Sequence, residues 1–263
     1  MLTGLLSDLL PQVSQPAIYV ASLAAVERLR ATEEGRAALA ACDCAAGLSL
    51  GEYTALAYAG AVTFEDGLRL VQARGAAMQA AADAAPSAMA AVIGLSAEQV
   101  EALCAAACAQ VGASDPGVRI ANFLCPGNYA VSGSVPAVAA LEALAKTPEH
   151  KARMTVRLAV AGAFHTDFMA PAVPALTAAL AATPISKPRL PVLSNVDARP
   201  HSDPEAIRAL LARQVVQPVQ WEATLNTLLA KGLQAAYEVG PGKVIAGTLK
   251  RISKETPCTN IEA

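Results

Sequence analysis

The stretch AACDCAAGLSLGEYTALAYAG, residues 40–60, decides the fold class of this chain. Small apolar residues lead into the GLSLG motif of residues 47–51, and a run of helix formers follows. This order predicts a strand, a sharp turn and a helix, the arrangement that exposes the serine of a GxSxG motif at a helix N-terminus. We expect glycine at both flanks because a Cβ would clash in so tight a turn. The segment favours an α/β fold with Ser49 as nucleophile, although a bare GxSxG is also compatible with an ordinary glycine-rich turn.

Helices and strands alternate on both sides of this segment. Residues 18–30 have apolar side chains at helical spacing, and residues 63–82 predict a helix that Thr63 opens with Asp66 in capping-box register. After residue 165 we expect, in order, a proline-interrupted helix to about 182, a strand at LPVLSNV, a helix from Asp203, a helix over 221–231, a strand at QAAYEVG and a helix after GPGK. Such alternation predicts a mostly parallel sheet covered by helices on both faces.

The pattern changes between residues 88 and 160. Strands are expected at MAAVIGL, VRIANFLC, YAVSGS and MTVRLAV, and helices over 97–109 and 135–146. The order βαββαβ is that of a ferredoxin-like module. We therefore predict an α/β large subdomain formed by residues 1–87 and 161–263, with a ferredoxin-like small subdomain, residues 88–160, inserted into it.

Composition excludes several classes of function. The chain has 263 residues, with 20 Lys plus Arg against 22 Asp plus Glu, and no basic run suited to a nucleic-acid backbone. No apolar run reaches the ~20 residues that cross a bilayer, so we expect a soluble protein that binds neither nucleic acid nor membrane. The cysteines lack the paired spacing of a zinc site, and we expect no metal; they are Cys42, Cys44, Cys104, Cys108, Cys125 and Cys258.

A serine hydroxyl needs a neighbouring base, and the chain has three histidines. His150 is expected in a polar loop and His201 in a turn, whereas His165 lies between a predicted strand and a helix, where α/β active sites gather. No carboxylate is an obvious partner for His165. Asp167 is better placed to cap the following helix, so a backbone carbonyl is expected to orient the imidazole.

Arg74 falls on the apolar stripe of the predicted 63–82 helix. Its planar guanidinium suits a substrate that carries a carboxylate. A snorkelling arginine or an internal salt bridge explains the same spacing equally well.

Five segments together resemble one family, the malonyl-CoA:acyl carrier protein transacylases. They are GLSLGEYTALAYAG, RGAAMQ around Arg74, GAFHT around His165, PVQW and EVGPGKVIAG. The resemblance extends from SQPAIYVAS to the end of the chain and is strongest to the plastid enzymes of plants and algae. It implies an α/β-hydrolase-like large subdomain with a ferredoxin-like insertion between nucleophile and histidine.

The resemblance also implies site residues. Ser49 is the nucleophile, His165 the general base and acid, and Arg74 the clamp for the malonyl carboxylate. The backbone carbonyl of Gln214 orients His165. The position of Leu50 at the start of the helix after the GxSxG turn, independently of the resemblance, places its backbone N–H where it can face the oxyanion. Three further residues line the acyl pocket: Gln15, Asn122 and Phe164, whose ring would crowd an α-methyl group.

The chain departs from the family pattern at two places. Leu48 stands where most members have histidine. The family begins with a strand and a GQGxQ loop that supplies a second oxyanion N–H, and we expect this chain to lack that segment. Loss of one such donor costs on the order of 10²–10³ in kcat.

The expected function is transfer of malonyl from malonyl-CoA to the phosphopantetheine thiol of acyl carrier protein by ping-pong chemistry through a malonyl-serine. No cofactor beyond these substrates is expected. We expect a monomer in the chloroplast stroma, or otherwise in the cytoplasm. Two alternatives stay open: a serine acyl hydrolase that releases the acyl group to water, and a truncated, weakly active or inactive homologue that only binds the carrier.

Overall fold

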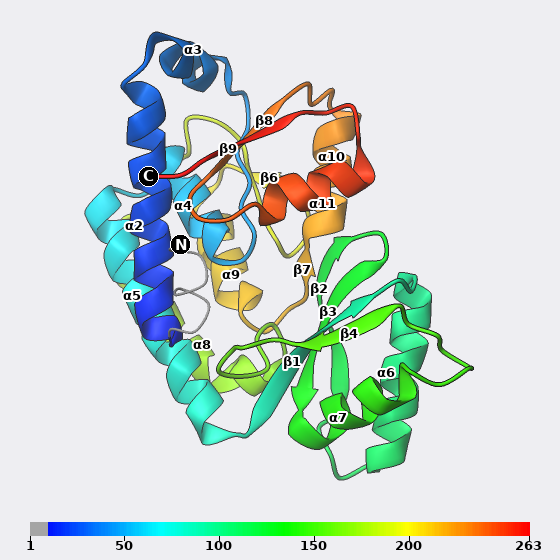
Figure 1. The fold of residues 1–263 in the computed structure, drawn as a ribbon. Helices are drawn as coiled ribbons and strands as arrows, with labels where there is room; N and C mark the ends of the chain where they lie inside the picture. Colours follow the sequence, from blue (N-terminus) through cyan, green and yellow to red (C-terminus); the bar gives the residue numbers. More distant parts are fainter. Residues whose placement is uncertain (1–9) are drawn as a thin grey trace.

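The computed structural model describes residues 10–263. The α/β fold is confirmed, and its elements occur in the order α2, α3, α4, α5, β1, α6, β2, β3, α7, β4, η1, α8, β5, β6, α9, β7, α10, β8, α11, β9 (Figure 1). The helices are α2 Pro11–Arg30, α3 Glu33–Ala41, α4 Leu50–Tyr58, α5 Phe64–Ala84, α6 Ala97–Val111, α7 Val135–Leu144, the 3₁₀ helix η1 Asp167–Ala172, α8 Val173–Ala182, α9 Pro204–Gln214, α10 Trp221–Ala230 and α11 Val244–Ile252. The strands are β1 Ser87–Ile93, β2 Val118–Cys125, β3 Asn128–Ser134, β4 Met154–Arg157, β5 Val192–Leu193, β6 Pro200–His201, β7 Val219–Gln220, β8 Ala236–Val239 and β9 Cys258–Ile261. None of the described helices has the length and apolar character of a membrane span.

The middle of the chain has the predicted βαββαβ order. Its sheet has the strand order β4-β1-β3-β2, with antiparallel pairing throughout, and β7 adds to β2 in parallel. Helices α6 and α7 pack on this sheet around a core of their own that includes Leu103, Val131 and Leu141 (Figure 1). The insertion is thus ferredoxin-like, as expected, while the limits at residues 88 and 160 stay a prediction.

The large subdomain surrounds a second apolar core. Helices α2 and α5 lie side by side, and α4, α8 and α9 close the core from other directions (Figure 1). The predicted cap is present: Thr63 Oγ1 accepts from the Asp66 N–H at 3.0 Å. Many small side chains of Ala, Val and Leu fill this core, so α5, the helix that carries Arg74, packs closely against α2.

The strands of the large subdomain are short. β8 and β9 are parallel, β5 and β6 are antiparallel, and the segment before Ser49 forms only a single parallel bridge, Ala45 with Val192. The prediction of a full strand before the serine was therefore wrong: among residues 10–263 this segment forms only the one bridge, on one side. The bridge still fixes the direction in which the chain enters the turn at residue 47.

The N-terminal helix was also predicted too short. Helical spacing was recognised only from residue 18, but α2 begins at Pro11 and runs through Pro16. Pro11 occupies the first turn, where a missing N–H costs nothing, and Pro16 removes only one bond from a helix that packs tightly on α5. This extra turn places Gln15 inside the helix and buries its side chain.

Candidate active site

Ser49 lies at a strained turn that opens α4. Its backbone has φ 51° and ψ −103°, in the left-handed region that side chains rarely adopt. A side chain from another part of the chain holds the turn: Asn195 Oδ1 accepts from the Ser49 N–H at 2.5 Å, and Asn195 Nδ2 donates to the Gly47 carbonyl at 2.7 Å. The half-buried hydroxyl is thereby placed at the N-terminus of a helix.

The two glycines of the motif have different roles. A Cβ at Gly47 would overlap the backbone carbonyl group of Gly51, whereas a Cβ at Gly51 would meet open space. The expectation that both flanks must be glycine for steric reasons was therefore wrong for Gly51. Only the first glycine permits the close approach of the turn to the helix.

His165 meets the serine hydroxyl. Its Nε2 lies 2.9 Å from Ser49 Oγ, and its Nδ1 lies 2.8 Å from the backbone carbonyl oxygen of Gln214. A carbonyl only accepts, so Nδ1 carries the hydrogen and Nε2 presents a lone pair to the hydroxyl. Burial and the nearby Arg74 charge lower the pKa of His165 to about 4. The imidazole is therefore neutral at pH 7 and able to accept a proton.

The loop that carries His165 is fixed from the small subdomain. Arg119 on β2 donates to the Val216 carbonyl at 2.8 Å and more weakly to the His165 carbonyl at 3.4 Å. Asp167 was expected to cap the following helix. That helix, η1, has Thr166 at its cap without a side-chain bond, and Asp167 instead lies 3.5 Å from Arg119 at the surface. The attraction of the guanidinium explains the difference.

Arg74 is fully buried and points at the nucleophile. Its Nη2 donates to Ser49 Oγ and to Gln214 Oε1, both at 3.0 Å, and its Nη1 donates to Gln15 Oε1 at 2.6 Å. The Ser49 hydroxyl thus accepts from Arg74 while it donates to His165. Three groups that are distant in the sequence meet at one oxygen atom.

The surroundings of Arg74 fit neither a snorkelling arginine nor an internal salt bridge. The side chain is 1% exposed, so it does not snorkel, and no carboxylate lies within ion-pair distance of it among residues 10–263. The Tyr53 ring lies 5.2 Å from the guanidinium carbon. Within the described part of the chain Arg74 Nε has no acceptor, and burial lowers the pKa of the guanidinium. A buried cation with an unused donor is suited to an anionic ligand.

The other expected residues lie at different distances from this centre. Gln15 contacts Arg74 directly, and Leu50 is the first residue of α4, whose N–H has no acceptor within the helix. Phe164 packs beside Met89 at the junction of the subdomains. Asn122 is buried on β2 opposite Val219, and it forms no hydrogen bond to Ser49, His165 or Arg74 among the described contacts.

Two residues at the site were missed by the sequence reasoning. Glu52, on the first turn of α4, is buried and accepts from the Asn195 backbone N–H at 3.0 Å and from Gln214 Nε2 at 2.7 Å. A lone carboxylate in the otherwise apolar run after the GxSxG motif was an available signal for Glu52. Asn195 is the last residue but one of the predicted LPVLSNV strand, and strand ends are where α/β sites gather.

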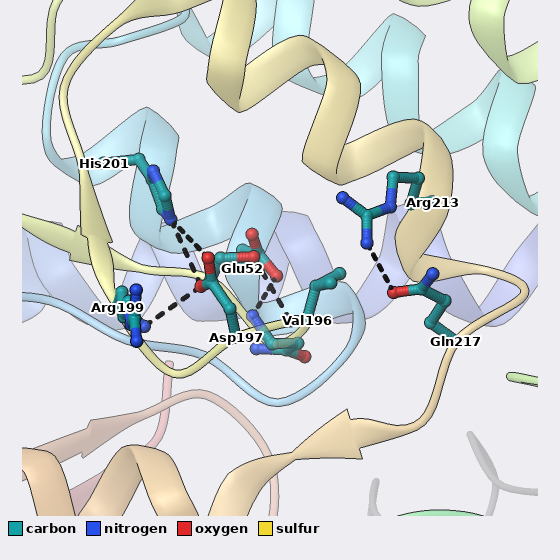
Figure 2. Close-up of polar contacts among 9 residues, drawn as sticks. Glu52, Val196, Asp197, Arg199, His201, Arg213 and Gln217 are labelled. Carbon is teal, nitrogen blue, oxygen red and sulfur yellow. Dashed lines mark hydrogen bonds and ion pairs between the residues drawn. The ribbon is translucent and has the colours of Figure 1, made fainter.

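The remaining histidines lie outside the site. His201 lies on β6, and its Nε2 is 2.9 Å from Oδ2 of Asp197, in the loop between β5 and β6 (Figure 2). His150 lies in the turn before β4. Residues 10–263 contain no group of three or more potential metal ligands. The positions of His150 and His201 agree with the choice of His165 as the base.

A strained serine at a helix N-terminus and a neutral imidazole on its hydroxyl are the parts of a serine acyl-transfer site, here inside an α/β fold with a ferredoxin-like insertion. The family model "Acyl transferase domain" matches residues 5–261. A curated relative, the mitochondrial malonyl-CoA-acyl carrier protein transacylase of Mus musculus, is 39% identical over 92% of this chain and 64% of its own length.

Two further comparisons agree. The malonyl CoA-acyl carrier protein transacylase of Bacillus subtilis is 36% identical over 92% of this chain and 72% of its own length. The crystal structure of an acyl-carrier-protein S-malonyltransferase from Bartonella henselae has a TM-score of 0.87 and 35% identity, covering 97% of this chain and 78% of the other. The chain belongs to the malonyl-CoA-acyl carrier protein transacylase family.

The alignments cover only part of each relative's own sequence. The chain spans just under two thirds of the length of the mouse relative. The expected lack of a GQGxQ segment concerns the chain before residue 10, outside the described residues. The expected likeness to plastid enzymes stays a prediction, since the mouse and B. subtilis relatives are mitochondrial and bacterial.

Proposed function

We propose that this chain transfers a malonyl group from malonyl-CoA to the phosphopantetheine thiol of an acyl carrier protein, through a malonyl ester of Ser49. One observation carries the proposal: the buried Arg74 guanidinium donates to the Ser49 hydroxyl oxygen at 3.0 Å and has no carboxylate partner in the described chain. An acyl group that ends in a carboxylate can pair with Arg74 and place its thioester beside Ser49.

In the first half-reaction His165 Nε2 takes the Ser49 proton while the hydroxyl oxygen attacks the thioester carbonyl. The oxyanion forms at the start of α4, where the Leu50 N–H and the helix dipole favour negative charge. The carbon–sulfur bond then breaks, and His165 gives its proton to the coenzyme A thiolate. Malonyl is left as an ester on Ser49.

In the second half-reaction the carrier thiol gives its proton to His165 Nε2 and attacks the ester carbonyl. The bond from that carbon to Ser49 Oγ breaks, and the proton returns to the hydroxyl. Acyl transfer changes no oxidation state, so the proposed cycle needs only the malonyl thioester and the carrier thiol, and no cofactor. The products are malonyl-carrier protein and free enzyme, in ping-pong order.

Location and assembly remain part of the proposal. The carrier protein as acceptor follows from the names of the mouse and B. subtilis relatives. Imaging of the tagged full-length protein tests the chloroplast stroma, and sedimentation tests the expected monomer.

Mass spectrometry tests the proposed function. The chain is mixed with malonyl-CoA, digested and searched for an adduct of malonyl mass on Ser49; holo acyl carrier protein is then added. We expect the adduct to form and to move to the phosphopantetheine thiol. An adduct that disappears without any malonyl-carrier product would identify a hydrolase, and no adduct at all would indicate an inactive homologue.

A further inference from the structure

Glu52 is a buried carboxylate with no role in the steps above. It lies three residues after the nucleophile on α4 and is 3% exposed. Its hydrogen-bond donors are neutral groups, among them the Asn195 backbone N–H at 3.0 Å and the Gln214 side-chain amide at 2.7 Å. Figure 2 shows Glu52 on α4 beside the loop that carries Val196 and Asp197. Burying a carboxylate is costly, and this one stabilises no ion pair within 4 Å in the described chain.

The Gln214 side chain joins Glu52 to the catalytic centre. Its Nε2 donates to Glu52 and also to the Ser49 backbone carbonyl at 3.0 Å, and its Oε1 accepts from Arg74 Nη2 at 3.0 Å. One amide at the end of α9 therefore contacts residues on α4 and α5. All of its hydrogen-bonding atoms are used.

The chemistry of the carboxylate sets the orientation of this amide. Glu52 Oε2 accepts from the Gln214 NH₂ group, and the Arg74 guanidinium only donates, so Gln214 turns its NH₂ group to Glu52 and its oxygen to Arg74. In the opposite orientation the NH₂ group would face the guanidinium donors, and both would lose their partners. Burial raises the pKa of Glu52 to about 7, and the Arg74 charge across the amide opposes part of this rise.

We propose that Glu52 is a positioning residue which, through the Gln214 side chain, holds the Arg74 guanidinium in place for the substrate carboxylate and so sets the preference for carboxylate-bearing acyl groups. The inference rests on the proposed function, because it names the residue that orders the malonyl clamp. It concerns selectivity and not the attack itself: His165 is held by the Gln214 backbone carbonyl, which side-chain substitutions leave in place.

The test compares two acyl donors on the full chain. Transfer from malonyl-CoA is expected to depend on Arg74 more strongly than transfer from acetyl-CoA, which has no carboxylate, so the ratio of the two kcat/KM values reports the clamp and cancels a general loss of folded enzyme. We expect Glu52→Leu and Gln214→Leu each to lower this ratio about tenfold or more, the effect of one lost bond to a charged group. Glu52→Gln should stay within about threefold of wild type, since its amide oxygen still accepts.

Two more variants distinguish a positioning role of Glu52 from a structural one. Glu52→Asp keeps the charge but withdraws the carboxylate from Gln214, so it should lower the ratio even where Glu52→Leu fails to fold. Glu34→Gln, an exposed first-turn glutamate on α3, is the matched control and should not change the ratio. Equal losses with both donors in Glu52→Asp would reduce Glu52 to a structural residue and overturn the proposal.

A double variant tests whether Glu52 acts on Arg74 through the Gln214 side chain. Because both residues act through one amide, Glu52→Leu combined with Gln214→Leu should lower the ratio no further than either single variant. Additive losses would show that Glu52 does not act through Gln214. A wild-type chain that transfers no malonyl would instead refute the proposed function.

Stability measurements test the coupling of Glu52 to Arg74 without an activity assay. Urea midpoints are measured for Glu52→Asp, Arg74→Met and the double variant. We expect the shift of the double variant to be smaller than the sum of the two single shifts, because the residues share the Gln214 amide. Strictly additive shifts would contradict the claim.

Discussion

The Nδ1 atom of His165 lies 2.8 Å from the backbone carbonyl oxygen of Gln214, so a main-chain group orients the base where many serine enzymes use a carboxylate. This oxygen cannot be removed by a side-chain substitution. We therefore expect Gln214→Leu to keep its reaction with a fluorophosphonate, which labels an activated serine without needing Arg74. His165→Ala should lose on the order of 10²–10⁴ in labelling rate because Ser49 loses its base. Comparable losses in both variants would contradict the main-chain assignment.

The pH dependence of labelling should reveal the buried state of His165. Its pKa is lowered from the ordinary 6.5 to about 4, chiefly by burial, so the neutral form that acts as base persists as the pH falls below 6.5. We expect the labelling rate of Ser49 to stay level from pH 7 to about pH 5.5 and to decline only as the pH approaches 4. The rate is followed by intact-mass measurement at each pH. A half-maximal rate near pH 6.5 would show that the imidazole is solvated.

The same shift predicts a trend in stability. A depressed folded-state pKa means that the unfolded chain binds a proton at His165 that the folded chain does not. His165 therefore reduces the free energy of unfolding as the pH falls from 6.5 towards 4. His165→Gln should lessen the decline in urea midpoint between pH 7 and pH 5. An unchanged decline would place its cause elsewhere.

Arg74 should separate malonyl transfer from general acyl transfer. Arg74→Ala removes the donors that face the substrate carboxylate, and we expect a loss on the order of 10²-fold in kcat/KM for malonyl-CoA, with a smaller effect on acetyl-CoA. Arg69→Ala is the matched control, since Arg69 lies on the same helix at the surface and pairs with Asp66. A simple esterase would respond equally little to both substitutions.

The two motif glycines should differ sharply on substitution. Gly47→Ala introduces a Cβ that overlaps the backbone of Gly51, so we expect reduced stability and loss of Ser49 labelling. Gly51→Ala places its Cβ in open space inside the first turn of α4, where alanine is the better helix former. Its urea midpoint should equal or exceed that of wild type. Equal damage from both variants would mean that the turn is not limited by this contact.

Glu238 offers a stability test away from the site. Its two carboxylate oxygens accept from the N–H groups of Ile245 and Ala246, at 2.8 and 3.0 Å, and so cap the first turn of α11. We expect Glu238→Ala to lower the free energy of unfolding by about 1–2 kcal/mol. The exposed Glu255→Ala serves as control. No difference between the two urea midpoints would show that the cap contributes nothing.

Local sequence signals determined much of the architecture. The GxSxG turn followed by helix formers placed Ser49 at the start of α4, and the Thr63 cap fixed the start of α5. The alternation of strand and helix between residues 88 and 160 was sufficient for the ferredoxin-like order. These features depend on periodicity and on turn chemistry, which neighbouring residues carry within a few positions of one another.

Other features were not determined locally. The single bridge at Ala45, the passage of α2 through Pro16 and the pairing of Asp167 with Arg119 each depend on a partner from a distant segment. Propensity favours a strand before Ser49, but a strand needs neighbours on its edges before it can form. Within residues 10–263 only Val192 supplies one.

The sequence alone determined which residue types were available for chemistry: a serine at a turn, one histidine at a strand end and an arginine on an apolar stripe. Only the tertiary structure decided that these groups meet at Ser49 Oγ, and that Gln214 and Glu52 surround them. The physical reason is that hydrogen bonds and desolvation act over a few ångströms in space, whereas these residues are separated by up to 165 positions along the chain. Packing of α2, α4, α5 and α9 around one core brings them within that range.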